Sequence, residues 1–331
     1  MSSNQTNLSR IGVLTSGGDA PGMNAAIRAV VRTCVYNNVI PFGIYQGYEG
    51  LIYDNIQEMD AGSVKHIIYQ GGTILKSARS LEFKTRAGME RAWKNVQKHK
   101  FDAMVVIGGD GTFKGAMEFG NLYDFPIIGI PGTIDNDIYG TDFTVGFDTA
   151  VNTVVEAVDK IRDTATSHNR LFFIEVMGRD AGFIAVYSGI AAGAEEILIP
   201  EEDRGIQQLF ESLERTSKRK KSSRLVIVAE GDKNGSVYDL KDEVQERFGD
   251  RYETKVTVLG HVQRGGRPSC ADRVLASQMG VKAVEALLEG KCNVMVGIRD
   301  RKVKFTDFNQ ATKQNPKMDA ELLRIADIIS I

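Results

Sequence analysis

The amino-acid sequence predicts an α/β fold with a mostly parallel sheet. Short apolar runs that suit buried strands alternate along the chain with stretches of ten or more residues that have helical periodicity. Three of the apolar runs lead directly into turns rich in glycine or aspartate. In sheets of this class, ligands gather beyond the carboxyl ends of the strands, so we expect the three turns to form one active site.

The first of these turns follows a strand predicted at residues 11–15. It occupies residues 16–22 and leads into a helical pattern over residues 23–36. Backbone N–H groups in such a turn and the positive end of the helix can hold phosphate, although a plain strand-to-helix connection is the alternative. Arg28 and Arg32 share one face of the helix, which indicates either a solvated surface or an oxyanion-binding one.

The next part of the chain contains a loop that ends on a cation. A strand is predicted at residues 39–45, the loop spans residues 71–79, and a helix is predicted at residues 87–99. Arg79 at the end of the loop could reach nucleotide phosphates. A lone loop arginine is more often simply solvated.

The second turn contains a carboxylate. A strand at residues 102–107 runs into GGDGT at residues 108–112, and a helical pattern follows. No GxxxxGK[ST] motif is present, and Lys114 stands where GxGxxG requires its last glycine. A P-loop enzyme and a standard dinucleotide-binding dehydrogenase are therefore both disfavoured.

The third turn places two carboxylates close together in sequence. A strand predicted at residues 126–130 is followed directly by the turn PGTIDND at residues 131–137. In an extended backbone, Asp135 and Asp137 would point to the same side and could face one ligand. One could hold a metal while the other meets a hydroxyl. The alternative is a turn whose Asp and Asn side chains bond their own backbone.

The remaining chain continues the alternation of strands and helices. Helices are predicted at residues 149–164, 207–215 and 271–288, and strands at residues 171–176, 196–199, 225–229, 255–259 and 293–298. The basic run at residues 218–221 is typical of a solvated helix end.

Composition excludes several classes of function. The 331 residues suffice for two domains, and 41 Lys and Arg against 43 Asp and Glu leave no charge bias toward nucleic acid or a membrane. The polar N-terminus and the lack of a long apolar run predict a cytoplasmic protein. The three cysteines form no CxxC pair, so we expect reduced, mostly buried thiols and no zinc site.

Five motifs in order resemble the bacterial-type ATP-dependent phosphofructokinases, the phosphofructokinase A family. They are TSGGDAPGMNA, GGDGT, PGTIDND, EVMGRDAG and GHVQRGG. The resemblance implies two three-layer α/β/α domains with the active site in the cleft between them. The larger, ATP-binding domain would be residues 1–145 and 262–312, and the smaller, sugar-phosphate-binding domain would be residues 146–261 and 313–331. A homotetramer, in which a neighbouring subunit completes each site, is also implied.

The implied reaction transfers the γ-phosphoryl group of ATP to the C1 hydroxyl of fructose 6-phosphate, the committed step of glycolysis. Its products are fructose 1,6-bisphosphate and ADP. Such a transfer has a loose transition state and depends chiefly on positioning and charge neutralisation. The resemblance assigns Asp135 as proton acceptor and Asp110 as the Mg²⁺ ligand, and it adds Asp137, Thr133 and Arg179 to the catalytic set.

The resemblance also implies three binding sets. The ATP-binding positions are Gly18, Arg79, Ser80, Gly109, Asp110, Gly111 and Thr112. The sugar-phosphate positions are Thr133, Ile134, Asp135, Arg170, Met177, Gly178, Arg179, Glu230, Lys255, His261, Val262, Gln263 and Arg264. An effector site, where ADP or GDP activates and phosphoenolpyruvate inhibits, matches Arg28, Arg32, Arg162, Gly193, Glu195 and Lys221.

One departure and two alternatives remain. Lys255 stands where bacterial members carry an arginine, so the bidentate fork for phosphate is lost. A pyrophosphate-dependent enzyme would read GGDD and PKT in the second and third turns, whereas Gly111 and Gly132 leave that space open and favour ATP. A non-catalytic regulatory paralogue is disfavoured because Asp110 and Asp135 are intact.

Overall fold

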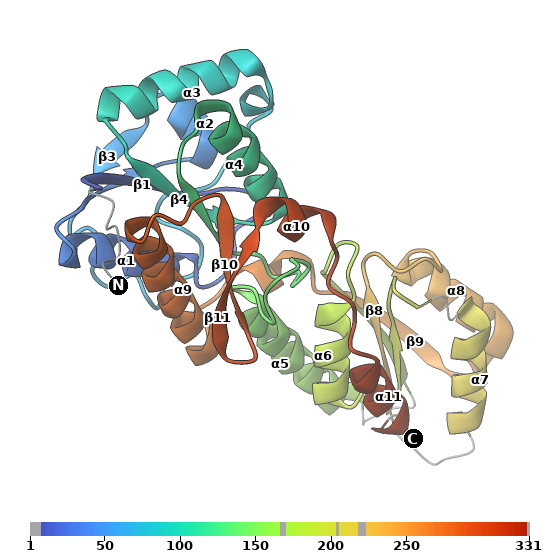
Figure 1. The fold of residues 1–331 in the computed structure, drawn as a ribbon. Coiled ribbons are helices and arrows are strands. Elements are labelled where there is room, and N and C mark those ends of the chain that lie inside the picture. The colour runs from blue at the N-terminus through green and yellow to red at the C-terminus, as the bar shows by residue number, and fades with distance from the viewer. Residues whose placement is uncertain (1–7, 166–169, 203–204, 218–222, 330–331) are drawn as a thin grey trace. The chain divides into compact units, whose positions relative to one another are not determined.

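The computed structural model describes residues 8–165, 170–202, 205–217 and 223–329, and Figure 1 shows the elements that they form. The chain divides into two compact units, with boundaries after Thr149, after Gln263 and after Pro316. Each unit has its own sheet, and most neighbouring strands in the two sheets run parallel. The predicted α/β class is therefore confirmed, while the substrates assigned to each domain stay predictions.

The sheet of the first unit has seven strands in the order β11-β10-β5-β4-β1-β2-β3. Its strands are β1 (Arg10–Thr15), β2 (Ile40–Ile44), β3 (Ile56–Glu58), β4 (Ala103–Gly108), β5 (Ile127–Pro131), β10 (Val294–Arg299) and β11 (Lys302–Asp307). Only the edge pairs β2 with β3 and β10 with β11 run antiparallel among these strands. The strands that carry the predicted turns, β1, β4 and β5, are parallel neighbours in the middle of the sheet.

Helices cover both faces of this sheet. They are α1 (Met23–Tyr36), α2 (Gly47–Ile52), α3 (Arg86–His99), α4 (Asp110–Tyr123), α9 (Cys270–Leu288) and α10 (Phe308–Lys313). Helices α1 and α9 pack together on one face, and α2, α3 and α4 lie on the other (Figure 1). Successive strand residues point to opposite faces, so Met104 and Val106 join the core under α3 and α4 while Val105 is buried on the side of α1 and α9.

The second unit is built on a four-stranded sheet in which all pairs run parallel, in the order β7-β8-β6-β9. The strands are β6 (Arg170–Val176), β7 (Glu196–Leu198), β8 (Ser223–Ala229) and β9 (Glu253–Val258). Its helices are α6 (Phe183–Ala192), α7 (Gly205–Ser217), α8 (Val237–Phe248) and α11 (Ala320–Ile329), and α5 (Phe147–Ala165) contains the boundary after Thr149. Leu171 and Phe173 of β6 share one core with apolar side chains of α7 and α8.

Helix α1 has the bounds that its apolar periodicity predicts. The side chains of its predicted inner face, Ala26, Ile27, Val30, Val31 and Cys34, are all buried. The helix begins after Gly22, whose φ of 106° lies in the left-handed region that glycine adopts readily. The first glycine-rich turn is thereby held between β1 and a helix start.

The prediction of mostly buried thiols is wrong. Cys34 is buried, and burial raises the pKa of its thiol to about 12. Cys270 and Cys292 are exposed. Cys270 begins α9 and Cys292 follows its end, so neither lies on a stripe that faces the core.

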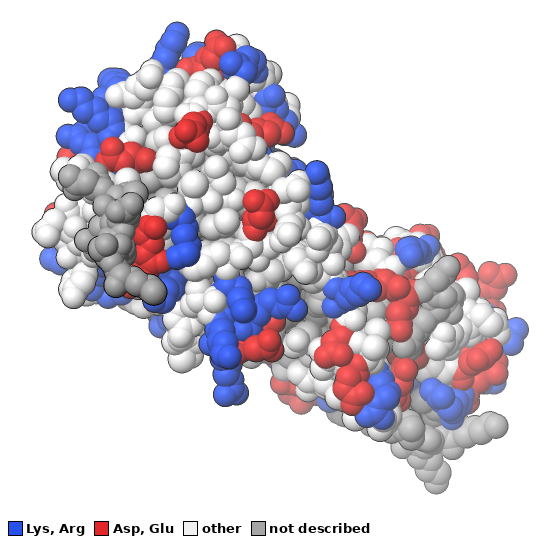
Figure 2. All heavy atoms as spheres, viewed as in Figure 1, with Lys and Arg blue, Asp and Glu red and all other residues white. Residues whose placement is uncertain are grey.

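Surface charge on the described residues is mixed. Figure 2 shows Lys and Arg interspersed with Asp and Glu on the face in view, in keeping with the near-neutral composition. Across the part of the chain that the structure describes, no helix has both the length and the apolar character needed to cross a membrane.

Candidate active site

The three predicted turns meet at one edge of the first sheet. Ser16 N, after β1, donates to Ile107 O of β4 at 3.0 Å, and Gly132 N, after β5, donates to Gly108 O at 3.0 Å. The hydroxyl of Thr112 donates to Ser16 O at 3.1 Å. Because parallel neighbours end at the same edge, these bonds bring all three turns together, as the sequence predicts.

The first turn also holds an arginine from a distant part of the chain. Arg264 Nη1 donates to Asp19 O at 3.3 Å. A Cβ built at Gly18 would lie 2.7 Å from Arg264 Nη1, so a larger residue there would displace the end of the arginine side chain. Gly18 of the predicted ATP set and Arg264 of the predicted sugar-phosphate set are therefore neighbours within the first unit.

The second turn presents a helix N-terminus beside a carboxylate. Helix α4 begins at Asp110 directly after Gly109, so its first backbone N–H groups and Asp110 lie together. Asp110 Oδ2 lies 3.1 Å from Lys114 Nζ, and the Asp110 side chain is about a third exposed. A Cβ built at Gly111 would meet no heavy atom within 4 Å, so the space beside Asp110 is open.

The third turn is not extended, and this corrects the same-side argument for its two carboxylates. Asn136, between Asp135 and Asp137, has a φ of 54° in the left-handed region. The alternation of a strand therefore does not apply here. Asp135 is buried at 7% exposure, whereas Asp137 is half-buried.

Arg79 and Ser80 follow a loop that is tied to the first turn. Thr15 Oγ1 at the end of β1 donates to Lys76 O at 2.7 Å. Asn24 of α1 binds the same loop, accepting from Ile74 N at 2.8 Å through its Oδ1. Arg79 is exposed, and Ser80 Oγ accepts from Phe83 N at 3.2 Å.

The sugar-phosphate residues of the second unit gather at the carboxyl ends of its strands. Glu230, after β8, accepts through Oε1 from Arg179 N at 2.7 Å and from Gly178 N at 3.3 Å, both after β6. Gln263, after β9, is fully buried and accepts from Met177 N at 3.2 Å. His261 and Val262 are exposed in the short 3-10 helix Gly260–Arg264. Gln263 and Glu230 thus shape the loop that carries Arg179.

Arg170 lies at the amino end of β6, and Lys255 is the third residue of the neighbouring strand β9. Glu253 accepts from Arg170 Nε at 3.0 Å and lies 2.9 Å from Lys255 Nζ. Lys255 and then Arg170 lower the pKa of the Glu253 carboxyl to about 2. Strand β6 separates Arg170 from Val176 by six steps of about 3.3 Å, roughly 20 Å in all. Lys255, in register with Phe172, lies four such steps from Val176, so both cations are set back from the start of the Arg179 loop.

The predicted effector residues fall into separate groups. Arg28 and Arg32 face each other on α1, where burial and then the charge of Arg32 lower the pKa of Arg28. In the second unit, Arg162 Nη2 donates to Gly193 O at 3.1 Å, and buried Glu195 accepts from Leu225 N at 2.6 Å. Lys221 lies outside the described residues.

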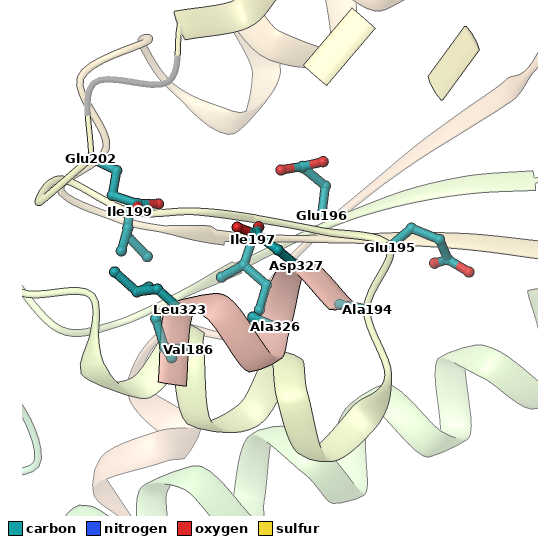
Figure 3. Close-up of a pocket in the computed structure, with 10 residues that line it drawn as sticks. All are labelled: Val186, Ala194, Glu195, Glu196, Ile197, Ile199, Glu202, Leu323, Ala326 and Asp327. Carbon is teal, nitrogen blue, oxygen red and sulfur yellow. The ribbon is translucent and has the colours of Figure 1, made fainter. Parts of the chain in front are cut away.

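A small pocket adjoins Glu195 but does not suit a nucleotide. Figure 3 shows it between helix α11, which supplies Leu323, Ala326 and Asp327, and the segment that contains β7. Its volume of about 20 Å³ admits little more than water.

Comparison with known proteins decides the family. A sequence profile described as phosphofructokinase matches residues 10–287 of the chain. The chain belongs to the phosphofructokinase family. An ATP-dependent 6-phosphofructokinase of Halalkalibacterium halodurans is 53% identical over 324 residues, which is 98% of this chain and 100% of the relative. Another of that name from Brevibacillus brevis is 52% identical over 97% of this chain and 99% of its own length.

Solved phosphofructokinase structures share the fold. That of Saccharomyces cerevisiae is 38% identical with a TM-score of 0.86; the match covers 92% of this chain and 45% of the yeast chain. This chain therefore spans about half the length of the yeast polypeptide. A pyrophosphate-dependent phosphofructokinase of Marinobacter aquaeolei has a TM-score of 0.84 over 98% of this chain and 92% of its own, but at 23% identity it supports the fold alone.

Reasoning from sequence missed Thr144 and considered Asn136 only as a turn residue whose side chain bonds the backbone. Thr144 is fully buried and donates to Thr133 O at 2.6 Å, and Asn136 accepts from Thr144 N at 2.8 Å. Asparagine in a turn is a recognised signal for left-handed backbone, but nothing in the sequence pairs it with a threonine eight positions later.

A half-buried carboxyl next to the Arg179 loop makes stability depend on pH. Burial raises the pKa of Glu175, and the carboxylate of Glu230 raises it further. The folded state therefore gains stability from this group at acid pH and loses it as pH rises through the raised pKa. Glu175→Gln, which keeps the shape without the charge, is expected to raise the Tm more at about pH 8 than at about pH 5. Exposed Glu243, changed to Gln, is the control, and an equal shift of the Glu175→Gln Tm at both pH values would contradict the prediction.

Proposed function

We propose that this chain transfers the γ-phosphoryl group of ATP to the C1 hydroxyl of fructose 6-phosphate. The observation that carries the proposal is the joining of the Asp110 turn to the Asp135 turn, through the 3.0 Å bond from Gly132 N to Gly108 O. An anion-binding helix start, a metal-binding carboxylate and a buried carboxylate then lie at one sheet edge. The names of the relatives, ATP-dependent 6-phosphofructokinases, support the same donor and acceptor.

The residues divide the work of the transfer. The first two turns and the N-terminus of α4 bind the phosphates of ATP through backbone N–H groups. Asp135 orients the C1 hydroxyl and accepts its proton as the bond to phosphorus forms. Arg179 offsets the charge of the transferring group, and Thr133 helps to position the substrates.

Asp110 fits the Mg²⁺ that such a reaction uses. Among the described residues, no group of three or more His, Cys, Asp or Glu side chains is placed to coordinate a metal ion. Mg²⁺ is usually held by one or two carboxylates together with substrate phosphates and water, so a partly exposed Asp110 beside a phosphate site is suitable. When bound, the ion neutralises charge on the β- and γ-phosphates.

For fructose 6-phosphate, the donor set matches a sugar with one phosphate. Arg179, His261 and Arg264 suit the 6-phosphate, and Glu230 suits sugar hydroxyls. Arg170 lies about 20 Å along β6 from Val176, where the Arg179 loop begins, and Lys255, in register with Phe172, lies four steps or about 13 Å from it. We infer that a second copy of the chain supplies these two cations in a homotetramer.

Lys255→Arg is expected to lower the KM for fructose 6-phosphate several-fold. Arginine restores a bidentate fork for phosphate, whereas lysine offers one compact charge that Glu253 partly neutralises at 2.9 Å. Steady-state kinetics with saturating ATP measure the change. Lys241→Arg is the matched control, because Lys241 is also paired with a carboxylate in the same unit. An unchanged KM for fructose 6-phosphate in Lys255→Arg would contradict a role of Lys255 in binding the sugar phosphate.

The open space at Gly111 favours ATP over pyrophosphate as donor. No heavy atom lies within 4 Å of a Cβ built there, so Gly111→Asp leaves the fold intact and projects a carboxylate beside Asp110. We expect kcat/KM for ATP to fall at least about tenfold, a loss of about 1.4 kcal/mol. Gly111→Asn adds a side chain of similar size without the charge, so comparing the two variants separates the effect of size from that of charge. An unaltered kcat/KM for ATP in both variants would argue against a phosphate in that space.

The proposed donor is tested by turnover of the purified chain with fructose 6-phosphate and either ATP or pyrophosphate. Release of ADP in a coupled assay, with little or no turnover from pyrophosphate, is the expected result. Turnover from pyrophosphate alone would identify the pyrophosphate-dependent alternative, and no turnover from either donor would favour a regulatory paralogue.

We also propose an effector site for ADP, GDP or phosphoenolpyruvate. Arg28 and Arg32 on α1, and Arg162 beside Gly193 in the second unit, offer the positive charges that such anions need. Rate curves against fructose 6-phosphate should shift when ADP or phosphoenolpyruvate is added. Identical rate curves with and without these compounds would contradict the proposed effector site.

A further inference from the structure

The turn that carries Asp135 is closed by a buried ring of hydrogen bonds. Thr144 Oγ1 donates to Thr133 O at 2.6 Å, and Thr144 N donates to Asn136 Oδ1 at 2.8 Å. Asp135 N in turn donates to Thr133 Oγ1 at 3.2 Å. Thr133, Asp135, Asn136 and Thr144 are 8%, 7%, 6% and 0% exposed, so water does not compete effectively for these bonds.

Asn136 is the residue of this ring with an unusual backbone conformation. Its φ of 54° is uncommon for a residue other than glycine, and such a conformation persists only where the surroundings enforce it. Its amide makes a bond at each end, because Nδ2 also donates to Asp142 O at 3.2 Å. Since both partners are backbone groups with fixed donor or acceptor character, the orientation of the amide is settled.

The base of the loop is closed as well. Val145 N, next to Thr144, donates to Pro131 O at 2.9 Å, and Gly132 forms an isolated bridge with Val145. The segment from Gly132 to Val145 is therefore tied at its ends by backbone contacts, and next to these by the side-chain bonds of Thr144 and Asn136. The peptide N–H of Asp135 and the side chain of the following residue, Asn136, are both held.

The position of the Asp135 carboxylate is the quantity that this ring controls. A displacement of about 1 Å at a reacting group can cost about 10²-fold in rate. Removing the Thr144 hydroxyl withdraws a hydrogen bond from a buried carbonyl, which destabilises this turn relative to other turn geometries.

We propose that Thr144 and Asn136 are positioning residues that hold Asp135 in line with the reacting hydroxyl. The inference rests on the proposed function and deepens it, because it assigns to this site two residues that act through Asp135 rather than on the substrate. The proposal also gives a reason why Thr144, which lies outside the PGTIDND motif, is fully buried beside that motif.

Thr144→Val tests the ring with almost no change in volume. We expect kcat to fall about 10- to 10²-fold while the KM values for ATP and fructose 6-phosphate change much less, because the base acts only in the transition state. Thr144→Ser keeps the hydroxyl and should restore most of the rate. Asn136→Gly permits the same φ but removes both side-chain bonds, so it should lower kcat in the same way. Rates are expressed per nucleotide-binding site counted by titration, so that unfolded chains do not contribute.

A double-mutant cycle separates positioning from a general structural role. In an Asp135→Asn background, Thr144→Val should leave the residual kcat unchanged, since the group that it positions is already absent. Thr33→Val is the matched control, because Thr33 is also buried and donates to a backbone carbonyl at 2.7 Å, within α1. The control should keep the wild-type kcat.

The outcomes are distinct. An undiminished kcat in Thr144→Val, or an equal loss in the presence and absence of Asp135, would overturn the positioning role. A wild-type chain that fails to phosphorylate fructose 6-phosphate would instead overturn the proposed function on which the inference rests.

Discussion

Asp135→Asn is expected to lower kcat by about 10³- to 10⁴-fold with little change in the KM for either substrate. The amide keeps the size of the carboxylate and its place in the buried turn, where Asp135 is 7% exposed, but it cannot accept the proton of the C1 hydroxyl. Removing an interaction that is made only in the transition state lowers kcat and kcat/KM equally. Steady-state rates at saturating substrate, with circular dichroism to verify folding, provide the measurement.

The control for this variant is Asp300→Asn. Asp300 is exposed in the turn between β10 and β11, and its φ of 50° is one that asparagine tolerates well. The control should keep the wild-type kcat. If Asp135→Asn were folded and lost less than about tenfold, the proton acceptor would have to be another group.

Asp110→Asn is the second variant with a large expected effect. A metal ion supplies several kcal/mol of charge stabilisation in such reactions, and every 1.36 kcal/mol corresponds to about tenfold in rate. Weakening the carboxylate that holds it should lower kcat/KM for ATP by about 10²-fold or more at ordinary Mg²⁺ concentrations. Raising the Mg²⁺ concentration should recover part of the loss, because the substrate phosphates still offer ligands.

Asp124→Asn controls for a change of charge on the same helix. Asp124 caps the far end of α4 with a φ of 48°, which asparagine also adopts. Its kinetics should be those of the wild type. A loss in Asp110→Asn that no concentration of Mg²⁺ alters would speak against a metal-holding role.

The fold was predictable where a residue pattern had one interpretation. The apolar stripe of α1 predicted both its bounds and its buried face, and the central strands β1, β4 and β5 are continuous apolar runs between turns. Helix α8 was missed although Val237, Leu240 and Val244 recur at helical spacing. Other missed elements lack such patterns. Helix α6 is apolar around most of its circumference, so its buried residues show no helical stripe, and β3 has only three residues.

The sequence predicted which segments form the site better than it predicted how their side chains are arranged. Glycine-rich turns after strands indicate which segments meet, because parallel strands share an edge. The same rule does not extend to Arg170, which begins a strand and so lies at the other edge of its sheet. Spacing also suggested that Asp135 and Asp137 share a side, and the left-handed Asn136 between them removes that expectation. Bonds such as that from Thr144 to Thr133 depend on tertiary closure, which no local pattern encodes.

The most direct test of the central claim is to follow the phosphorus signals while the purified chain acts on fructose 6-phosphate with MgATP. With the wild type, we expect ³¹P NMR to show a new phosphate ester on C1 and an equal amount of ADP. We expect the same signals to grow about 10³-fold more slowly with Asp135→Asn. Phosphate appearing on another carbon, release of inorganic phosphate without a sugar product, or equal rates for the two proteins would contradict the central claim.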